Sequence, residues 1–220
     1  MKNWVRAAGA GCAVALLTLS GTPGAVASPR EVDEARLVPS LADSSFAPFD
    51  CKLRRTGPVC TGERHYETGW EDAGLPCDVP VYGMREEHRY QTRYYDTGYL
   101  NYDRRFRTHD LDSLSTSPDG PATATVRAQT RFDEPFAVPG DESTKSVITT
   151  GTIWDVRRAT GPALFRAVGT LVEAPGVEPV FSGQVSEDGV STRYDQVPLS
   201  AFFSEEEFLG LLCQAATTLS

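Results

Sequence analysis

Turn signals divide this sequence at short, regular intervals, and they constrain the fold more than any other feature. Gly- and Pro-containing turns recur between residues 56 and 189, and the runs between them are rich in β-branched and aromatic residues. Such runs are typical of antiparallel strands. We therefore predict an all-β fold, an antiparallel sandwich or barrel of roughly seven to nine strands with one C-terminal α-helix. A length of 220 residues allows one such domain, which we place at residues 46–220.

The clearest pair of strands is predicted at residues 87–95 and 99–109, on either side of Asp96-Thr97-Gly98. A three-residue turn would place Tyr94 opposite Leu100 and Tyr90 opposite Arg104. One face of this hairpin then mixes aromatic rings with hydroxyl and charged groups, which a dry core avoids unless every polar group is paired. The opposite face, which carries Arg89, Gln91, Arg93, Asn101, Asp103, Arg105 and Arg107, is expected to face solvent.

Two interpretations of the mixed face remain open. In the first, the interior is hollow and binds a ligand, as small barrels can. In the second, the tyrosines pack with their hydroxyls at the rim, and Arg104 pairs with a carboxylate or reaches water. The pocket interpretation assigns five residues to the lining: His88, Tyr90, Tyr94, Tyr102 and Arg104.

Further strands are predicted at residues 122–132, 146–156, 163–173 and 177–185. The chain then turns helical from Glu205 to about Thr217. Ser204 is a suitable N-cap, and Glu207 follows three residues later, as in a capping box. Phe203 and Phe208 are spaced for a hydrophobic staple across the first turn.

The N-terminus has the order of a secretory signal peptide. Lys2 and Arg6 precede an apolar run at residues 7–20, and Ala25-Val26-Ala27 forms a small-residue cleavage site. The run is shorter than the roughly 20 residues that span a bilayer, so we expect no membrane anchor in the mature form. We predict a signal peptide at residues 1–27, a flexible lead-in at residues 28–45, and a secreted protein.

The cysteines fit this location. Four remain once Cys12 leaves with the signal peptide, and an even number in a secreted chain indicates disulfides. Four cysteines allow three connectivities. Because a Gly-Pro turn lies between Cys51 and Cys60, we favour the pairs Cys51–Cys60 and Cys77–Cys213. No closely spaced cysteine pair is present to indicate zinc.

The acidic balance of the chain excludes some partners. The net charge is −9, and loss of Lys2 and Arg6 would leave 19 basic and 30 acidic residues, a net charge of −11. Such a chain is poorly suited to nucleic acid or to anionic membranes. We expect no nucleic-acid partner.

No motif of an enzyme stands out. Asp96-Thr97-Gly98 matches the aspartic-protease triplet, but that chemistry needs a second carboxylate of the same kind, so a hairpin turn is the better interpretation. Glu63, His65 and Glu67 alternate and could share one face of a strand, where exposed edge residues are the simpler account. The three histidines form no local metal motif. We therefore predict no catalytic residue, no metal site and no cofactor.

Two segments carry a resemblance to a group of known proteins. Leu75-Pro76-Cys77-Asp78-Val79-Pro80 precedes the first long predicted strand, and Phe208-Leu209-Gly210-Leu211-Leu212-Cys213 lies in the predicted helix. In this arrangement the chain resembles small secreted actinobacterial β-proteins with a cysteine in a C-terminal helix. The resemblance covers roughly residues 46–217 and implies the compartment and the fold, but no activity.

These observations lead to three expectations for function. The first is a secreted, non-catalytic binding or interaction domain whose partner is a small molecule or a protein. The second is a structural protein of the extracellular space or cell envelope. The third is a small barrel enzyme, similar to a cyclase or isomerase, that acts on a small hydrophobic substrate.

Overall fold

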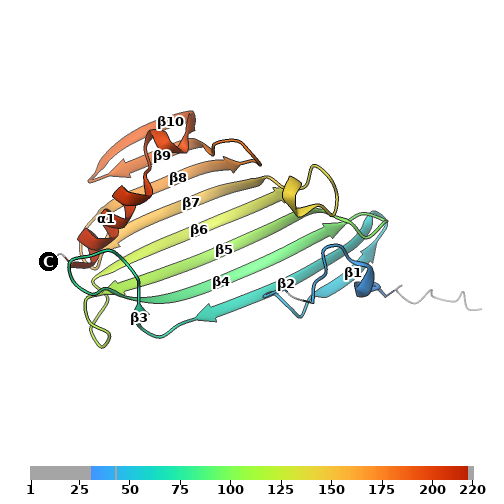
Figure 1. Cartoon of the computed structure of the whole chain (residues 1–220), viewed down its shortest axis with the longest axis horizontal. Helices are drawn as coiled ribbons and strands as arrows, with labels where there is room; N and C mark the ends of the chain where they lie inside the picture. Colours follow the sequence, from blue (N-terminus) through green and yellow to red (C-terminus); the bar gives the residue numbers. More distant parts are fainter. Residues whose placement is uncertain (1–30, 43, 218–220) are drawn as a thin grey trace, which may run out of the picture. The chain divides into compact units, whose positions relative to one another are not determined.

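Ten antiparallel strands form one sheet, and a single α-helix follows them (Figure 1). The computed structural model describes residues 31–42 and 44–217, so the predicted signal peptide lies outside the described residues. The strands are β1 (Asp50–Arg54), β2 (Gly57–Glu67), β3 (Glu71–Asp72), β4 (Tyr82–Tyr95), β5 (Asn101–Ser115), β6 (Ala124–Pro135), β7 (Val147–Arg158), β8 (Ala163–Glu173), β9 (Val180–Glu187) and β10 (Val190–Pro198). Short 3-10 helices lie at Glu34–Arg36, Glu142–Thr144 and Leu199–Ala201, and α1 is Glu205–Thr217.

The strand order is a simple meander. It runs β1-β2-β4-β5-β6-β7-β8-β9-β10, and the short β3 pairs with β4 beyond the end of β2. The antiparallel β class and the C-terminal helix are thus confirmed. The strands number ten, and they form one open sheet, because β1 and β10 do not pair with each other.

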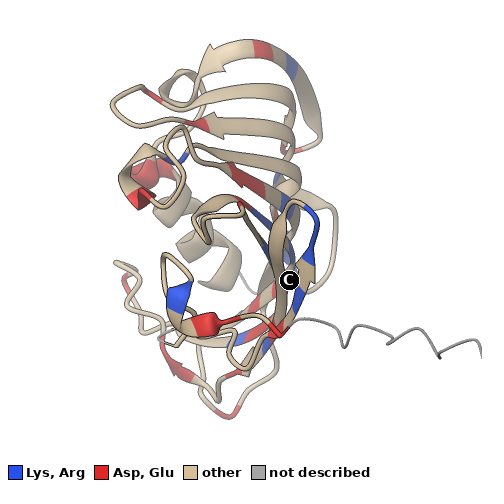
Figure 2. Ribbon diagram, turned by 90° about the vertical axis from the view of Figure 1, so that its right-hand side faces the viewer, with Lys and Arg blue, Asp and Glu red and all other residues tan. Residues whose placement is uncertain are grey.

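Figure 2 shows that the sheet is curved and that α1 lies on the inner side of the curve. We call this side the inner face and the opposite side the outer face. The inner face carries two separate apolar clusters. One gathers under α1 around Leu114, Val156 and Phe165, and the other lies at the opposite end of the strands around Leu37, Leu41 and Tyr95. Between them the inner face carries buried polar residues, among them Glu87, Gln91 and Thr108, beside the ring pair Phe106–Phe132.

The helix begins and ends as its sequence predicts. The N–H of Glu207 donates to Ser204 Oγ at 3.1 Å, and the Ser204 hydroxyl donates to the Glu207 carboxylate at 2.9 Å. The rings of Phe203 and Phe208 lie 5.3 Å apart across the first turn. Trp154 stacks on Phe203 at 4.5 Å, which fastens the start of the helix to β7.

The segment before β1 is part of the packed structure, and here the expected flexible lead-in is wrong for the described residues. Val32, Leu37, Leu41 and Phe46 are buried. The Val38 N–H donates to the Tyr99 carbonyl at 3.0 Å and the Val38 carbonyl accepts from Asn101 at 2.8 Å. The apolar residues of this segment follow neither a helix nor a strand period, because the backbone that places them in the cluster around Tyr95 is irregular.

Both predicted disulfides are present. Cys51 and Cys60 lie directly opposite each other in the β1–β2 pair, with their Cα atoms 4.0 Å apart. Cys77 joins Cys213 across 136 residues and ties the loop after β3 to α1. Because disulfides persist in oxidising compartments, both bridges indicate that the protein belongs in such a compartment.

Candidate functional site

The register of the β4–β5 hairpin decides where the predicted pocket residues lie, and it differs from our expectation. The positive φ needed by the turn falls on Tyr99, at +70°, so the loop extends to Leu100 and Tyr95 pairs with Asn101. A bulge then shifts the pairing once more, and Tyr94 lies opposite Asp103. The turn interpretation of Asp96-Thr97-Gly98 is confirmed, since Asp96 accepts from the N–H groups of Gly98 and Leu100.

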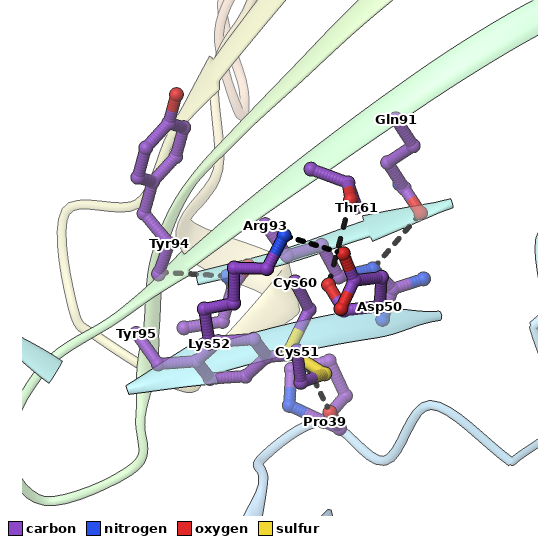
Figure 3. Close-up of a disulfide and its surroundings, with 11 residues drawn as sticks. Pro39, Asp50, Cys51, Lys52, Cys60, Thr61, Gln91, Arg93, Tyr94 and Tyr95 are labelled. Atoms are coloured by element: carbon purple, nitrogen blue, oxygen red, sulfur yellow. Dashed lines mark hydrogen bonds and ion pairs between the residues drawn. A yellow bond between two sulfur atoms is a disulfide. The ribbon is translucent and has the colours of Figure 1, made fainter. Parts of the chain in front are cut away.

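This shift of three residues places the five predicted pocket residues on two faces. A shift by an odd number reverses the faces of one strand relative to its partner. Tyr94 and Tyr95 point to opposite sides of β4, and Tyr95 lies on the side of the Cys51–Cys60 bridge (Figure 3). His88, Tyr90, Tyr94 and Tyr102 are on the outer face, whereas Arg104 is on the inner face opposite Arg93.

Arg104 is held in a buried ionic cluster. Only 7% of its surface is exposed. It pairs with Glu142 and lies 3.7 Å from Glu134, and its Nε donates to Asn101 Oδ1 at 3.1 Å. Burial, followed by the nearby Arg93, lowers the pKa of Arg104. Of the two earlier interpretations, this geometry matches the pairing of Arg104 with carboxylates.

The face that we expected to meet solvent is partly the inner face. Gln91 and Arg93 are buried where the segment before β1 packs on the sheet, through Ser44 and Phe49. The Arg93 guanidinium donates to Gln91 and to Ser44 and lies over the Phe49 ring. A polar row on one side of a strand is typical of a solvent face, and no local pattern shows that a distant segment covers it.

A cleft opens on the inner face beside α1, and we call it the α1 cleft. Its volume is about 480 Å³, within the range of about 300–1,000 Å³ typical of small-molecule sites. The sheet forms the floor, α1 forms one wall and residues 66–75 form the other. Its apolar lining includes Leu75, Leu114, Val126, Trp154, Phe208 and Leu212.

The mouth of the α1 cleft is acidic. Glu71, Asp72 and Asp112 line the cleft together with one arginine, Arg85, whose Nε lies 2.7 Å from Asp112. The Asp112 carboxylate raises the pKa of Arg85. Asp112 is therefore balanced by Arg85, while Asp72 accepts from the Gly74 N–H at 2.9 Å. Glu71, which is exposed and lies opposite Gly83 in the register, is the carboxylate available to a ligand that carries positive charge.

The two walls of the α1 cleft are fixed to each other and to the floor. The Cys77–Cys213 bridge joins the loop after β3 to the helix. The Thr123 hydroxyl donates to the Ala216 carbonyl at 2.7 Å and holds the end of α1 on the sheet. The Ala73 N–H donates to the Val81 carbonyl at 2.9 Å and holds the loop on the chain just before β4. The cleft is thus formed in advance of any ligand.

The sequence did not reveal the α1 cleft. Trp154 and Phe208 both pack against the apolar cluster under α1. Nothing in their local pattern distinguishes a side chain that fills a core from one that also lines a cleft. Cys77 is the residue from which the cleft could have been predicted. A disulfide from Cys77 to the helix must bring the loop that carries Cys77 onto the face of the sheet where the helix packs.

The outer face brings together histidines that are far apart in the sequence. His65 pairs with His88, and His88 pairs with His109, in one row across β2, β4 and β5. His88 Nε2 lies 2.5 Å from a Glu63 carboxylate oxygen, and this hydrogen bond lowers the pKa of Glu63. Glu63, His65 and Glu67 share this face, as their alternation predicts, and all three are exposed.

Among the described residues, no group of three or more histidines, cysteines, aspartates or glutamates is arranged to hold a metal ion. Within the same residues, no helix has the length and apolar character needed to cross a membrane. Comparisons with protein-family models, with curated proteins and with solved structures found no match. The resemblance to small secreted actinobacterial β-proteins therefore stays a prediction.

Proposed function

We propose that this protein is secreted and binds a small amphipathic molecule, with an apolar body and a positively charged group, in the α1 cleft. The observation that carries the proposal is the pairing of an apolar interior with an acidic mouth in one preformed cleft. Pockets that are mainly apolar and carry a few well-placed polar groups are typical of small-molecule sites.

Each part of the cleft would contact a different part of the ligand. The apolar body would lie between the sheet and α1, against Val126, Trp154 and Leu212. The charged group would remain at the mouth, beside Glu71, which is exposed. Because the walls are already joined by a disulfide, little conformational entropy would be lost on binding.

The two disulfides and the signal-like N-terminus support secretion. A binding role also fits the absence of an enzyme motif in the sequence. Arg85 and Asp112 satisfy each other's charge at the mouth of the cleft, so neither is poised as a free acid or base.

Calorimetric titration with two model amphiphiles tests the proposal. Decyltrimethylammonium should bind more tightly than decyl sulfate, by up to about 5-fold, because one exposed charge contact is worth up to ~1 kcal/mol. Glu71→Lys should remove this preference without affecting the fold, since Glu71 is exposed. If neither amphiphile binds, or if both bind equally, the proposed ligand class is wrong.

A second variant addresses the apolar part of the cleft. Val126→Trp should fill the floor and abolish binding of decyltrimethylammonium. Val168→Trp is the matched control, because Val168 is 36% exposed and lies away from the cleft on β8. Binding that survives Val126→Trp in a folded protein would place the ligand elsewhere.

A further inference from the structure

The outer face carries a second hollow, which the proposed function does not use. Its volume is about 480 Å³, and it lies over β4, β5 and β6. It is lined chiefly by Tyr90, Tyr94, Arg105, Arg107, His109 and Arg131.

The lining of the hollow carries three arginines and no carboxylate, and three carboxylates lie around it: Asp103, Asp133 and Glu63, which is opposite Tyr90 in the register. Arg105 lies 3.0 Å from Asp103 and 3.6 Å from Asp133, and Arg131 lies 2.9 Å from Asp133. Two carboxylates thus balance two arginines. Arg107 stands between these pairs, opposite Arg131 and Tyr90 in the register.

Arg107 is the arginine of this surface that has no carboxylate partner. It is exposed, and within the part of the chain that the structure describes no carboxylate pairs with it. On a chain of net charge −9, an exposed arginine among two other arginines and a histidine gives a site that favours an anion.

The same surface offers flat aromatic faces. Tyr90 is 43% exposed and Tyr102 is 36% exposed. The ring centres of Tyr94 and Tyr102 are 6.4 Å apart. The Arg105 guanidinium lies 5.0 Å from the centre of the Tyr94 ring. Tyr90 and Tyr94 are four residues apart on one side of β4, a separation of about 13 Å along the strand.

We infer that this hollow binds an acidic polysaccharide, a chain of sugar rings that carry carboxylate or sulfate groups. Tyrosine rings provide surfaces for the apolar faces of sugars, and their hydroxyls provide hydrogen bonds at the edge. The arginines supply charge-assisted hydrogen bonds to carboxylate or sulfate. A row of rings about 13 Å long suits an extended chain better than a single sugar.

Single-stranded nucleic acid would use the same kinds of side chain, but the charge does not favour it. Such sites combine stacked aromatic rings with a basic groove that follows the phosphate backbone. Here one unpaired arginine does not form a basic groove that could follow a backbone with a phosphate at every nucleotide. Oligo(dT) therefore serves as the competing ligand in the test.

Calorimetric titration with a short oligogalacturonate should detect binding that weakens as salt increases, because the charges are exposed. Neutral dextran and oligo(dT) should each bind at least about 5-fold more weakly. Absence of oligogalacturonate binding, equal binding of dextran, or tighter binding of oligo(dT) would overturn the inference.

Three variants locate the site. Arg107→Ala should weaken oligogalacturonate binding by about 3- to 5-fold, the size expected for one exposed charge contact. Tyr90→Ala should weaken it by at least about 5-fold. Arg193→Ala on β10 removes an exposed arginine outside the hollow and should leave the affinity unchanged.

The two sites can be tested separately. Arg107→Ala should leave decyltrimethylammonium binding in the α1 cleft unchanged, because the two hollows are on opposite faces of the sheet. Loss of both ligands in this variant would show that the change acts on the fold, and the assignment of Arg107 to the site would fail.

Discussion

At the scale of single residues, two neighbouring arginines differ in how far they are buried. Arg104 and Arg105 follow each other on β5, so their side chains point to opposite faces. Arg104 is buried among Asn101, Glu134 and Glu142, and Arg105 is about half exposed beside Asp103. Burial rather than the presence of a partner decides what each contributes to stability.

Arg104→Ala should therefore destabilise the protein strongly. The change leaves Glu134 with Lys145, at 3.7 Å, as its cationic partner, but it removes the hydrogen-bond donor of the buried Asn101 Oδ1, and a buried polar group without its partner costs about 1–3 kcal/mol. Arg105→Ala should cost less than about 1 kcal/mol, because its ion pairs are exposed to water. Urea denaturation midpoints of the two variants measure the difference, and equal midpoints would contradict the burial of Arg104.

At the scale of elements, close packing of central strands depends on two facing glycines. Gly169 in β8 pairs with Gly183 in β9. A Cβ atom at Gly183 would lie 2.3 Å from the Val168 carbonyl oxygen and 2.7 Å from the Phe181 ring. The backbone of β8 and a buried ring thus occupy the space that any larger residue would need.

Gly183→Ala is expected to destabilise the protein by about 1–3 kcal/mol, because strand and ring must move apart. Gly210→Ala is the matched control. Gly210 lies in α1, and no atom is within 4 Å of the place that its Cβ would take, so alanine should stabilise the helix by up to ~1 kcal/mol. Thermal denaturation should show melting temperatures that move in opposite directions, and a neutral Gly183→Ala would show that β8 and β9 are less closely packed.

The elements also show which features can be predicted from sequence. The strand Ala163–Glu173 and the helix Glu205–Thr217 match their predicted bounds, because periodicity and capping are local signals. The β4–β5 register was wrong because two events moved it: the loop used Tyr99 for its positive φ, and Asn101 stabilised a bulge. Arg36 packs over the Tyr99 ring at 4.2 Å, a contact with a distant segment that no local pattern contains.

The same limit applies to the candidate site. The alternation of β4 correctly grouped His88, Tyr90 and Tyr94 on one face, but alternation does not say which face is covered. That depends on where residues 31–49 and α1 pack, and both are fixed by tertiary contacts. The α1 cleft and the outer hollow could therefore be located only from the structure.

At the scale of the whole molecule, the location of the protein can be tested directly. Cleavage after Ala27 should give a mature chain that begins at Ser28. Intact-mass analysis of protein from the culture medium should show the loss of residues 1–27 and the mass of two disulfides. A full-length chain retained in the membrane fraction, or any free thiol in the mature chain, would contradict secretion with two bridges.

The two disulfides should contribute unequally to stability. In the chain-entropy account, a bridge across 136 residues restricts the unfolded chain by about 5 kcal/mol, whereas a bridge across 9 residues contributes about 3 kcal/mol. The long bridge also joins the two walls of the α1 cleft, while Cys51–Cys60 joins strands that are already paired. Cys213→Ser should thus lower the urea midpoint more than Cys51→Ser.

Ligand binding separates the entropic effect of the bridge from its local effect on the cleft. At a temperature where both variants remain folded, Cys213→Ser should weaken decyltrimethylammonium binding, because the loop after β3 is no longer fixed to α1 and must be ordered by the ligand. Cys51→Ser should bind it as the unmodified protein does. The urea midpoint and the affinity for decyltrimethylammonium are to be measured on both variants. Equal losses of stability, or full affinity in Cys213→Ser, would contradict this account.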